Sequence, residues 1–307
     1  MTQVAMYART STKVSEIITT GKEVRGVTVL NDEIFLVYEK SAKVEVFEAA
    51  TLERKRNLAV AGLTKARDLK SNVADGCLYI ADDEGPEGLP CVHRVDVAAH
   101  DGEEESSSST RWPLDEIPGG ISLTPDGRRV IVTCYGALTP TLKEYTTDGE
   151  LVRKINLPAE MVHPRDAFQL PTGNFVVSHG FVTFDHVCRV CLIANDGGSV
   201  VQSYGSTPGS AAGHLKDPVR IAAGGANGFI LVADRENNRI LVLDETLSVA
   251  SCLVDLAPLC EDGEDSLPHR LCLDQQRARL LVAESEWRMA GHPKMWAFDV
   301  KFVSLAA

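Results

Sequence analysis

The sequence has few aromatic residues and no long apolar run. Aromatic residues make up 6% of its 307 residues, and its apolar stretches are as short as Phe229–Ala233. None of these stretches approaches the roughly 18 residues that a membrane-spanning helix needs. The N-terminus, Met1–Tyr7, lacks the basic segment followed by an apolar one that marks a secretory signal peptide. We therefore expect a cytoplasmic protein with no membrane association.

The motifs that identify common catalytic sites are also missing. The chain contains no HExxH zinc motif, no Walker phosphate-binding loop and no GxSxG nucleophile elbow. No residue is thereby singled out as a nucleophile or a general base. We expect no cofactor, and the sequence favours binding over catalysis without deciding between them.

Charge and cysteine content are those of an ordinary intracellular globular protein. The net charge is −12 and charged residues form 24% of the chain, close to the average composition. The 8 cysteines have no repeated spacing, and a chain of this length folds without disulfides. Cys188 and Cys191 form a CxxC motif in an expected strand, where residues three apart point to opposite faces. We therefore expect reduced cysteines and no zinc site at this pair.

A unit of three short strands recurs along the chain. Its clearest copy has strands within 217–222, 228–234 and 237–244, separated by turn residues. Weaker copies surround it, and together they give six copies spaced roughly 40 to 55 residues apart, the length of a β-propeller blade. Their first strands begin near residues 24, 66, 118, 164, 218 and 268.

A fourth strand is expected to complete each blade, as residues 150–155 do after the Asp148–Gly149 turn. The sixth copy has little chain left after Asp299, whereas residues 13–18 precede the first copy and have no blade of their own. We therefore expect the N-terminal strand to complete the last blade, which joins the two ends of the ring. The sequence predicts an all-β fold, a six-bladed β-propeller of four-stranded antiparallel blades, formed by residues 1–307 as a single domain.

One copy carries a recognisable motif. Residues 232–240, VADRENNRI, preceded by Pro218 and Ile221, resemble an NHL repeat. The resemblance extends over nearly the whole chain as a six-bladed NHL-type propeller, as in the C-terminal domains of TRIM proteins. NHL propellers include protein-binding and RNA-binding modules, and related six-bladed rings include lyases and metal-dependent lactonases. No RING, B-box or coiled-coil segment is present, so an excised domain and a free-standing propeller both stay open.

Charged residues recur at the ends of the second and third strands, where we expect them to form structural pairs across the turn. The acids at the end of the second strand are Glu39, Asp82, Asp234 and Glu284. The basic residues near the start of the third strand are Lys43, Arg94, Lys143, Arg189, Arg239 and Lys294.

A different set of residues lies just before each first strand. In propellers the first strands line the central channel, and the loops that enter them surround its mouth. Two aligned positions of the six copies fall at this mouth, and arginine is frequent at both. Guanidinium groups bind phosphate or carboxylate in bidentate fashion. We predict that the mouth binds a ligand, and the competing interpretation is that the same residues form salt bridges between blades. The predicted site consists of Arg25, Arg67, Asp68, Arg165, Asp166, Arg220, His269 and Arg270.

The same positions weaken the case for an enzyme. Amidating lyases of the NHL group place several histidines after the proline to hold zinc, whereas here only His269 does so, and one imidazole does not make a three-ligand site. Asp68 and Asp166 would supply two oxygen ligands for a lactonase-type cation, but the arginines around them repel a metal. A metal-dependent hydrolase or lyase is therefore our third hypothesis. Its remaining candidate ligands are His163, His179, His186 and His214.

Among binding functions, an anionic protein or peptide partner ranks first and single-stranded RNA second. A net charge of −12 repels a polyanion at long range. A local ring of arginines still suits a short single strand, with Tyr135 or Phe181 available for base stacking. An acidic or phosphorylated peptide needs less extended positive surface. We expect a monomer.

Two acidic segments interrupt the repeats. Residues 100–109 form an acidic, serine-rich insertion that we expect to be a mobile loop on the face opposite the mouth. Residues 261–265 enter the sixth copy on the same side as the arginines, as an acidic loop that either screens the mouth or is simply solvated.

Overall fold

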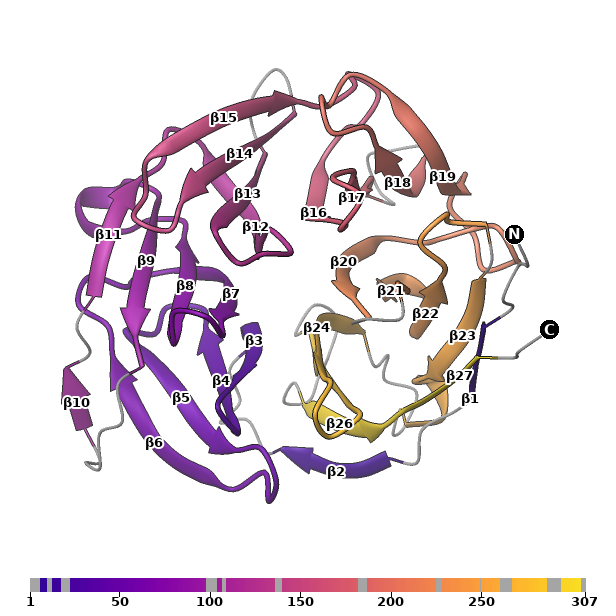
Figure 1. Cartoon of the computed structure of the whole chain (residues 1–307). Coiled ribbons are helices and arrows are strands. Elements are labelled where there is room, and N and C mark those ends of the chain that lie inside the picture. The colour runs from indigo at the N-terminus through magenta and orange to yellow at the C-terminus, as the bar shows by residue number, and fades with distance from the viewer. Residues whose placement is uncertain are drawn as a thin grey trace.

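The computed structural model describes residues 6–9, 13–17, 23–97, 104–106, 109–135, 140–181, 187–224, 228–248, 250–259, 267–285 and 294–304. Six antiparallel sheets stand around a central channel, with the first strand of each blade innermost and the fourth at the rim (Figure 1). The predicted all-β, six-bladed propeller is therefore confirmed. In the described part of the chain, no helix is long and apolar enough to cross a membrane.

The first three blades follow one another along the chain. Blade 1 contains β3 (Val24–Leu30), β4 (Glu33–Tyr38), β5 (Lys43–Glu48) and β6 (Arg54–Ala59). Blade 2 contains β7 (Ala66–Asn72), β8 (Cys77–Asp82), β9 (Cys91–Asp96) and β11 (Ser109–Pro113). Blade 3 contains β12 (Ile117–Leu123), β13 (Arg129–Tyr135), β14 (Thr141–Thr146) and β15 (Leu151–Asn156).

The other three blades complete the ring. Blade 4 contains β16 (Pro164–Gln169), β17 (Phe175–His179), β18 (Cys188–Ile193) and β19 (Val200–Ser206). Blade 5 contains β20 (Pro218–Ala223), β21 (Ile230–Asp234), β22 (Arg239–Leu243) and β23 (Ala250–Asp255). Blade 6 contains β24 (Pro268–Asp274), β25 (Arg279–Glu284) and β26 (Met295–Asp299). Short 3₁₀ turns lie at Pro86–Gly88, Arg235–Asn237 and Ala257–Leu259.

The N-terminal strand closes the ring as predicted. β2 (Lys13–Ile17) pairs antiparallel with β26 and is the fourth strand of blade 6. A second, unpredicted contact between the chain ends lies beside it, because β1 (Met6–Arg9) pairs with β27 (Lys301–Ser304). The two ends of the chain therefore meet at one side of the ring (Figure 1).

The serine-rich insertion was expected to be a loop, and this was wrong for the three residues that form a strand. Glu104–Ser106 forms β10, which pairs parallel with β6 on the rim of blade 1. The insertion leaves blade 2 and extends the neighbouring sheet, because the outermost strand of a blade has an unpaired edge. Residues 261–265 lie outside the described residues.

The hydrophobic core is divided among the interfaces between blades. Each of six apolar clusters combines side chains from two adjacent blades, such as Phe35 of blade 1 with Leu78 of blade 2. Cys188 belongs to the cluster between blades 4 and 5, and Cys191 to the one between blades 3 and 4. The two thiols therefore lie on opposite faces of β18, as the sequence predicted.

Candidate functional site

A β-bulge occurs at the same place in the first strand of every blade. The pairing register shifts between Val24 and Gly26 in blade 1, and at the corresponding residues of each other blade. A bulge leaves one extra residue outside the ladder and re-aims its side chain. The bulged residues are Arg25, Arg67, Gly119, Arg165, Val219 and His269, the earlier of the two aligned positions.

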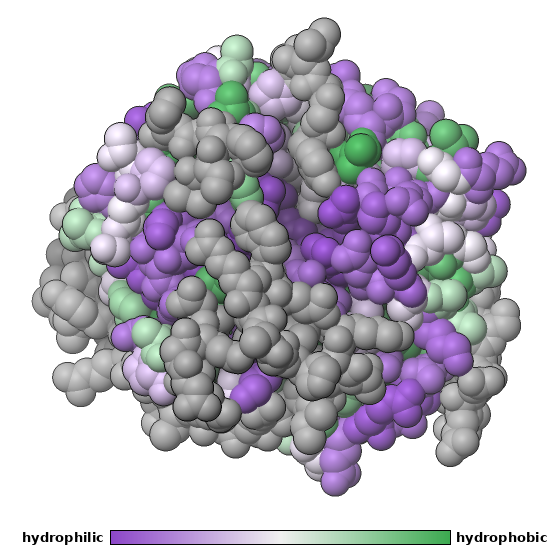
Figure 2. Space-filling model, turned by 180° about the vertical axis from the view of Figure 1, so that it is seen from behind, coloured by the Kyte–Doolittle hydropathy of each residue, from purple (hydrophilic) through white to green (hydrophobic). Residues whose placement is uncertain are grey.

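The bulged residues surround one cavity at the end of the channel. It has a volume of about 140 Å³ and is lined by all six of them, together with His163, Pro164, Arg220 and Arg270. The structure thus brings together six of the eight predicted site residues. The remaining two, Asp68 and Asp166, line a larger cavity of about 810 Å³ in the channel beyond. One face of the ring carries mainly hydrophilic residues around its centre (Figure 2).

Acidic side chains stand behind the mouth arginines. Arg25 binds Glu39 and lies 3.1 Å from a carboxylate oxygen of Glu23. Arg67 donates from Nε to Asp83 over 3.0 Å and from a terminal nitrogen over 2.5 Å. These carboxylates orient the guanidinium groups and reduce the net positive charge of the mouth. The two aligned positions do not include these acids, because Glu23 precedes β3 and Glu39 and Asp83 directly follow β4 and β8; of the three, the sequence singled out Glu39 alone, with a third-strand cation as its expected partner.

Arg165 has a different neighbour. Its guanidinium carbon lies 5.3 Å from the ring centre of Phe181, a distance typical of a cation–π contact. Arg235 approaches the same ring, at 5.9 Å. Phe181 therefore supports two cations and is not a free platform for a base; the side chain of Tyr135, the other proposed stacking residue, lies outside the described ones.

His269 is neutral at the mouth. Its Nδ1 lies 2.8 Å from Glu23, whose carboxylate also accepts a hydrogen bond from Ser285. Burial lowers the pKa of His269 well below its ordinary value, and Arg270 lowers it further. His269 therefore adds hydrogen-bonding capacity to the mouth but no charge.

Arg220 and Arg270 occupy the second aligned position and are buried. Arg220 donates to the carbonyl oxygens of Arg165 and Gly119, each over 2.9 Å. Arg270 donates to the carbonyl oxygens of Arg25 and, over 2.8 Å, Arg67. From blades 5 and 6 these two side chains thus reach blades 1, 2, 3 and 4, and they separate the mouth cavity from the channel.

Asp68 and Asp166 connect neighbouring blades. Asp68 accepts hydrogen bonds from the N–H groups of Leu69 (2.9 Å) and of Ile121 (3.0 Å) in the next blade. Asp166 does the same for Ala167 (3.0 Å) and Ile221 (3.2 Å). Burial raises the pKa of Asp166 to about 6, against the opposing effect of Arg220. Arg220 also lies 3.8 Å from Asp68, so buried charges of both signs meet at this level.

The expected pairs of acids with third-strand cations are confirmed in blade 5 and wrong in blade 2. Asp234 accepts a hydrogen bond of 2.7 Å from Nε of Arg239, its partner in the ladder. In blade 2 the ladder partner of Asp82 is Cys91, and Arg94 lies further along the strand, 3.1 Å from Asp96. The strand register decides which residue of β9 lies opposite Asp82, and that register depends on the length of the β8–β9 connection.

The remaining acids of that set bind other groups. Glu39 binds Arg25, and Glu284 accepts from the indole nitrogen of Trp296 and the backbone N–H of Lys294. Lys143 lies in a blade for which the sequence offered no acid at the end of the second strand; it binds Asp115 and lies 3.1 Å from Glu116.

The three reserve histidines that the structure describes are not brought together. His163 lines the mouth cavity, His179 lies 3.5 Å from Cys191, and His214 contacts Ser206 and the carbonyl of Thr207. His186 lies outside the described residues. Within the described part of the chain, the cluster of three metal-ligating side chains is a different one, Asp82, Cys91 and His93.

These features define the class: a six-bladed β-propeller with a closed channel and an arginine-rich mouth. Residues 215–243 match the family model of the NHL repeat, in the blade where the resemblance is clearest. No curated protein sequence matches the chain at a significant level.

Solved structures share the fold at low sequence identity. The PQQ-bound aldose sugar dehydrogenase of Streptomyces coelicolor is 13% identical, with a TM-score of 0.70 over 97% of this chain and 100% of the other. Hydrazine synthase of Kuenenia stuttgartiensis is 16% identical, with a TM-score of 0.59 over 95% and 98%. A chain of the nidogen/laminin complex is 15% identical, with a TM-score of 0.58 over 81% and 85%. These likenesses concern the fold alone.

Proposed function

We propose that the protein is a binding module whose channel mouth holds an anionic group of a protein or peptide partner. The observation that carries this proposal is the set of six bulges, which aim Arg25, Arg67 and Arg165 at one opening. Arg220 and Arg270 form the floor of the opening, and Asp68 and Asp166 hold that floor in place from the channel side.

The size of the cavity favours a macromolecular partner. Pockets for whole small molecules measure about 300–1,000 Å³, whereas the mouth cavity measures about 140 Å³. A space of this size admits a single carboxylate or phosphate group. The rest of such a ligand then lies on the surrounding face, as it does for a peptide side chain or a chain terminus.

Charge favours a peptide over RNA. Nucleic-acid affinity rests on several phosphates neutralised at once, but Glu23, Glu39 and Asp83 stand directly behind two of the mouth arginines. The binding of one anionic group depends mainly on direct contact with guanidinium N–H groups. The binding of an extended polyanion depends more on the net charge around the mouth, which these acids lower.

The proposal extends to the setting of the module. We propose that residues 1–307 act as one domain and as a monomer in the cytoplasm, with the recognition role that NHL propellers have in TRIM proteins. The seven described cysteines are all free, which suits a reducing compartment. Light scattering on the purified chain tests the monomer.

The site is tested with oriented peptide libraries that carry phosphoserine, glutamate or serine at one fixed position. Binding is measured by fluorescence anisotropy for the wild type and for Arg25→Gln/Arg165→Gln. We expect the anionic libraries to bind more tightly than the serine library. Each lost charge-assisted contact should weaken that binding about tenfold.

Arg128→Gln is the matched control, because Arg128 is 85% exposed in the turn between β12 and β13, at the other end of its first strand. Equal binding of all three libraries, or no loss in the double variant, contradicts the proposal. Tighter binding of single-stranded oligouridine, with a log–log salt slope near −3 for about four phosphate contacts, favours the RNA alternative.

A further inference from the structure

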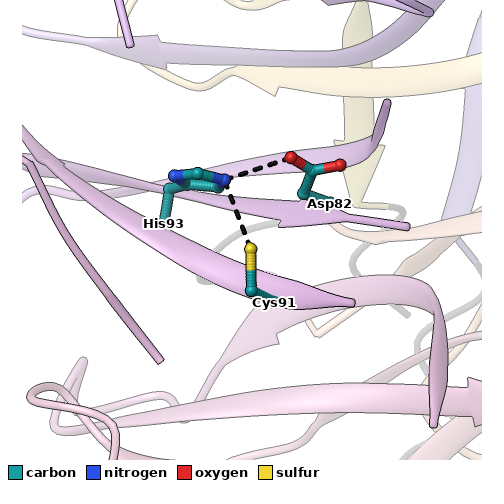
Figure 3. A group of neighbouring side chains, drawn as sticks. All are labelled: Asp82, Cys91 and His93. Carbon is teal, nitrogen blue, oxygen red and sulfur yellow. Dashed lines mark hydrogen bonds and ion pairs between the residues drawn. The ribbon is translucent and has the colours of Figure 1, made fainter. Parts of the chain in front are cut away.

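Three different metal-ligating side chains meet inside blade 2, and none of them lines the mouth cavity. Asp82 ends β8 and faces Cys91 in the ladder, and His93 lies two residues further along β9 on the same face. Nε2 of His93 lies 3.1 Å from an oxygen of Asp82 and 3.4 Å from the sulfur of Cys91 (Figure 3). Their exposed fractions are 0%, 4% and 0% for Asp82, Cys91 and His93.

The corresponding position in blade 5 shows what blade 2 lacks. There Asp234 is matched by the guanidinium of Arg239, which is its ladder partner. In blade 2 a thiol replaces that arginine, so the ladder supplies no positive charge to Asp82. A buried carboxylate needs a compensating charge or hydrogen bonds.

Backbone groups hold the Asp82 carboxylate in a fixed orientation. One oxygen accepts from the N–H groups of Lys65 (2.9 Å) and Gly85 (3.2 Å), and the other from the N–H of Thr64 (2.9 Å). The second oxygen is the one that faces His93. Ligating carboxylates are commonly oriented by such outer hydrogen bonds.

The two distances from His93 are close to those of a tetrahedral zinc shell, and the ligand atoms of Asp82 and Cys91 lie within 4.8 Å of each other. Zinc lies about 2.0 Å from nitrogen or oxygen and about 2.3 Å from sulfur. Tetrahedral angles then separate nitrogen from oxygen by about 3.3 Å and nitrogen from sulfur by about 3.6 Å. We propose that blade 2 binds one Zn²⁺ through Asp82 Oδ2, Cys91 Sγ and His93 Nε2.

Charge and protons balance in this site. Nε2 of His93 would bind the ion in the neutral tautomer that carries its proton on Nδ1, a buried atom with no hydrogen-bond partner among the described residues. The thiol of Cys91 releases its proton to solvent. One carboxylate and one thiolate then neutralise the two charges of the ion.

Three protein ligands leave the fourth tetrahedral position to a water molecule, and the burial of the cluster gives the ion a structural role. Through Asp82 it stabilises two segments at once, residues 64–65 before β7 and residues 84–85 after β8. The mixed oxygen, nitrogen and sulfur donor set favours zinc over magnesium or calcium, which prefer oxygen alone.

The test is the metal content of the tag-free protein, purified under reducing conditions and equilibrated with Zn²⁺ before desalting. Elemental analysis should give one zinc per chain in the wild type, and Cys91→Ser and His93→Gln should each lose it. Cobalt substitution should give a thiolate-to-cobalt charge-transfer band in the wild type that is missing from Cys91→Ser. Chelation should lower Tm in the wild type and leave the Tm of the two variants unchanged.

Cys191→Ser is the matched control, because Cys191 also contacts a histidine, with 3.5 Å between its sulfur and Nε2 of His179, but belongs to no three-ligand cluster of the described residues. It should keep the zinc and the cobalt band. The proposal is overturned by a wild type that retains no zinc after equilibration, or by full zinc content in Cys91→Ser. The cobalt spectrum of the wild type gives a decision even where a variant fails to fold.

Discussion

Arg220 on the first strand of blade 5 donates a 2.9 Å hydrogen bond to the carbonyl oxygen of Gly119 on the first strand of blade 3. The two residues stand on blades that are not neighbours, so the bond crosses the channel. The same guanidinium reaches the carbonyl of Arg165 in the blade between them. A residue that looked from its position like part of a ligand site thus holds the ring together.

Replacing Arg220 should destabilise the whole fold. Arg220→Met leaves carbonyl groups of blades 3 and 4 without their donor and removes the cation nearest Asp68 and Asp166. Breaking a buried charge network of this kind costs about 3–5 kcal/mol. Urea unfolding measures the loss, and Arg128→Met, at an 85% exposed position, should change stability by less than about 0.5 kcal/mol. Equal effects of the two substitutions would show that Arg220 is not a structural tie.

The Asp234–Arg239 pair should contribute less to the free energy of unfolding than Arg220 does, because its contacts lie within one region of the ring. Arg239 donates to Asp234 and also to the carbonyl oxygens of Ser210 (2.9 Å) and His214 (3.0 Å). Arg239→Ala removes these three hydrogen bonds, although Asp234 keeps its bonds from Lys216 and Asn237, and should cost about 1–3 kcal/mol in the free energy of unfolding. The binding of anionic peptides should not change, and a loss of binding without a loss of stability would contradict this assignment.

The N-terminal strand should be needed for the stability of the ring. Deletion of residues 1–18 removes β2 from blade 6 and β1 from its pairing with β27. Without β2 the outer edge of β26 is unpaired and the ring is no longer closed by a strand from the N-terminus, so Tm should fall. A synthetic peptide of residues 1–18, added in excess, should restore part of the loss. An unchanged Tm in the deletion variant would rule out the closing role.

The pKa of Asp166 predicts a pH dependence of known sign. An aspartate in the unfolded chain titrates near 3.9, whereas burial raises the pKa of Asp166 in the folded protein to about 6. Between these values the folded state binds the proton more tightly, so the contribution of Asp166 is fully present below about pH 4 and is lost as the pH rises through about 6. The loss is on the order of 3 kcal/mol.

Asp166→Asn should remove this dependence, so the variant should gain stability relative to the wild type as the pH rises from about 4 to about 7. Unfolding free energies across that range measure the difference. Asp126→Asn provides the control, because the hydroxyl of Thr124 and the N–H of Arg128 lower the pKa of Asp126, so its titration falls below this pH range and its difference from the wild type should stay nearly constant. A difference between Asp166→Asn and wild type that does not vary with pH would contradict the raised pKa.

The residues around the mouth show how much of the site could be predicted from the repeats. Aligning the copies identified Arg25, Arg67 and Arg165 as equivalent, and the structure has each of them at the bulge of its first strand. The alignment worked because a bulge at a fixed place in every blade gives equivalent residues equivalent directions. The alignment did not predict that Arg220 and Arg270, one position later, have a different role. Adjacent residues of a strand point to opposite faces, so these two side chains meet other neighbours.

Blade 2 shows a second limit. The sequence placed Arg94 opposite Asp82, but the ladder pairs Asp82 with Cys91. A connection of different length shifts which residue of the third strand meets the end of the second, and local sequence does not report that shift. The cluster of Asp82, Cys91 and His93 was therefore not among the predicted sites.

By itself, the sequence determined the all-β class, the six blades, the closing strand and the convergence of arginines on one end of the channel, because these follow from a repeat that each blade satisfies with its own residues. The tertiary structure alone decided which of the arginines that line the mouth cavity also tie the blades together, and which donors meet inside blade 2. Those outcomes depend on strand register and on neighbours supplied by other blades, up to 245 residues away in the case of Arg270 and Arg25.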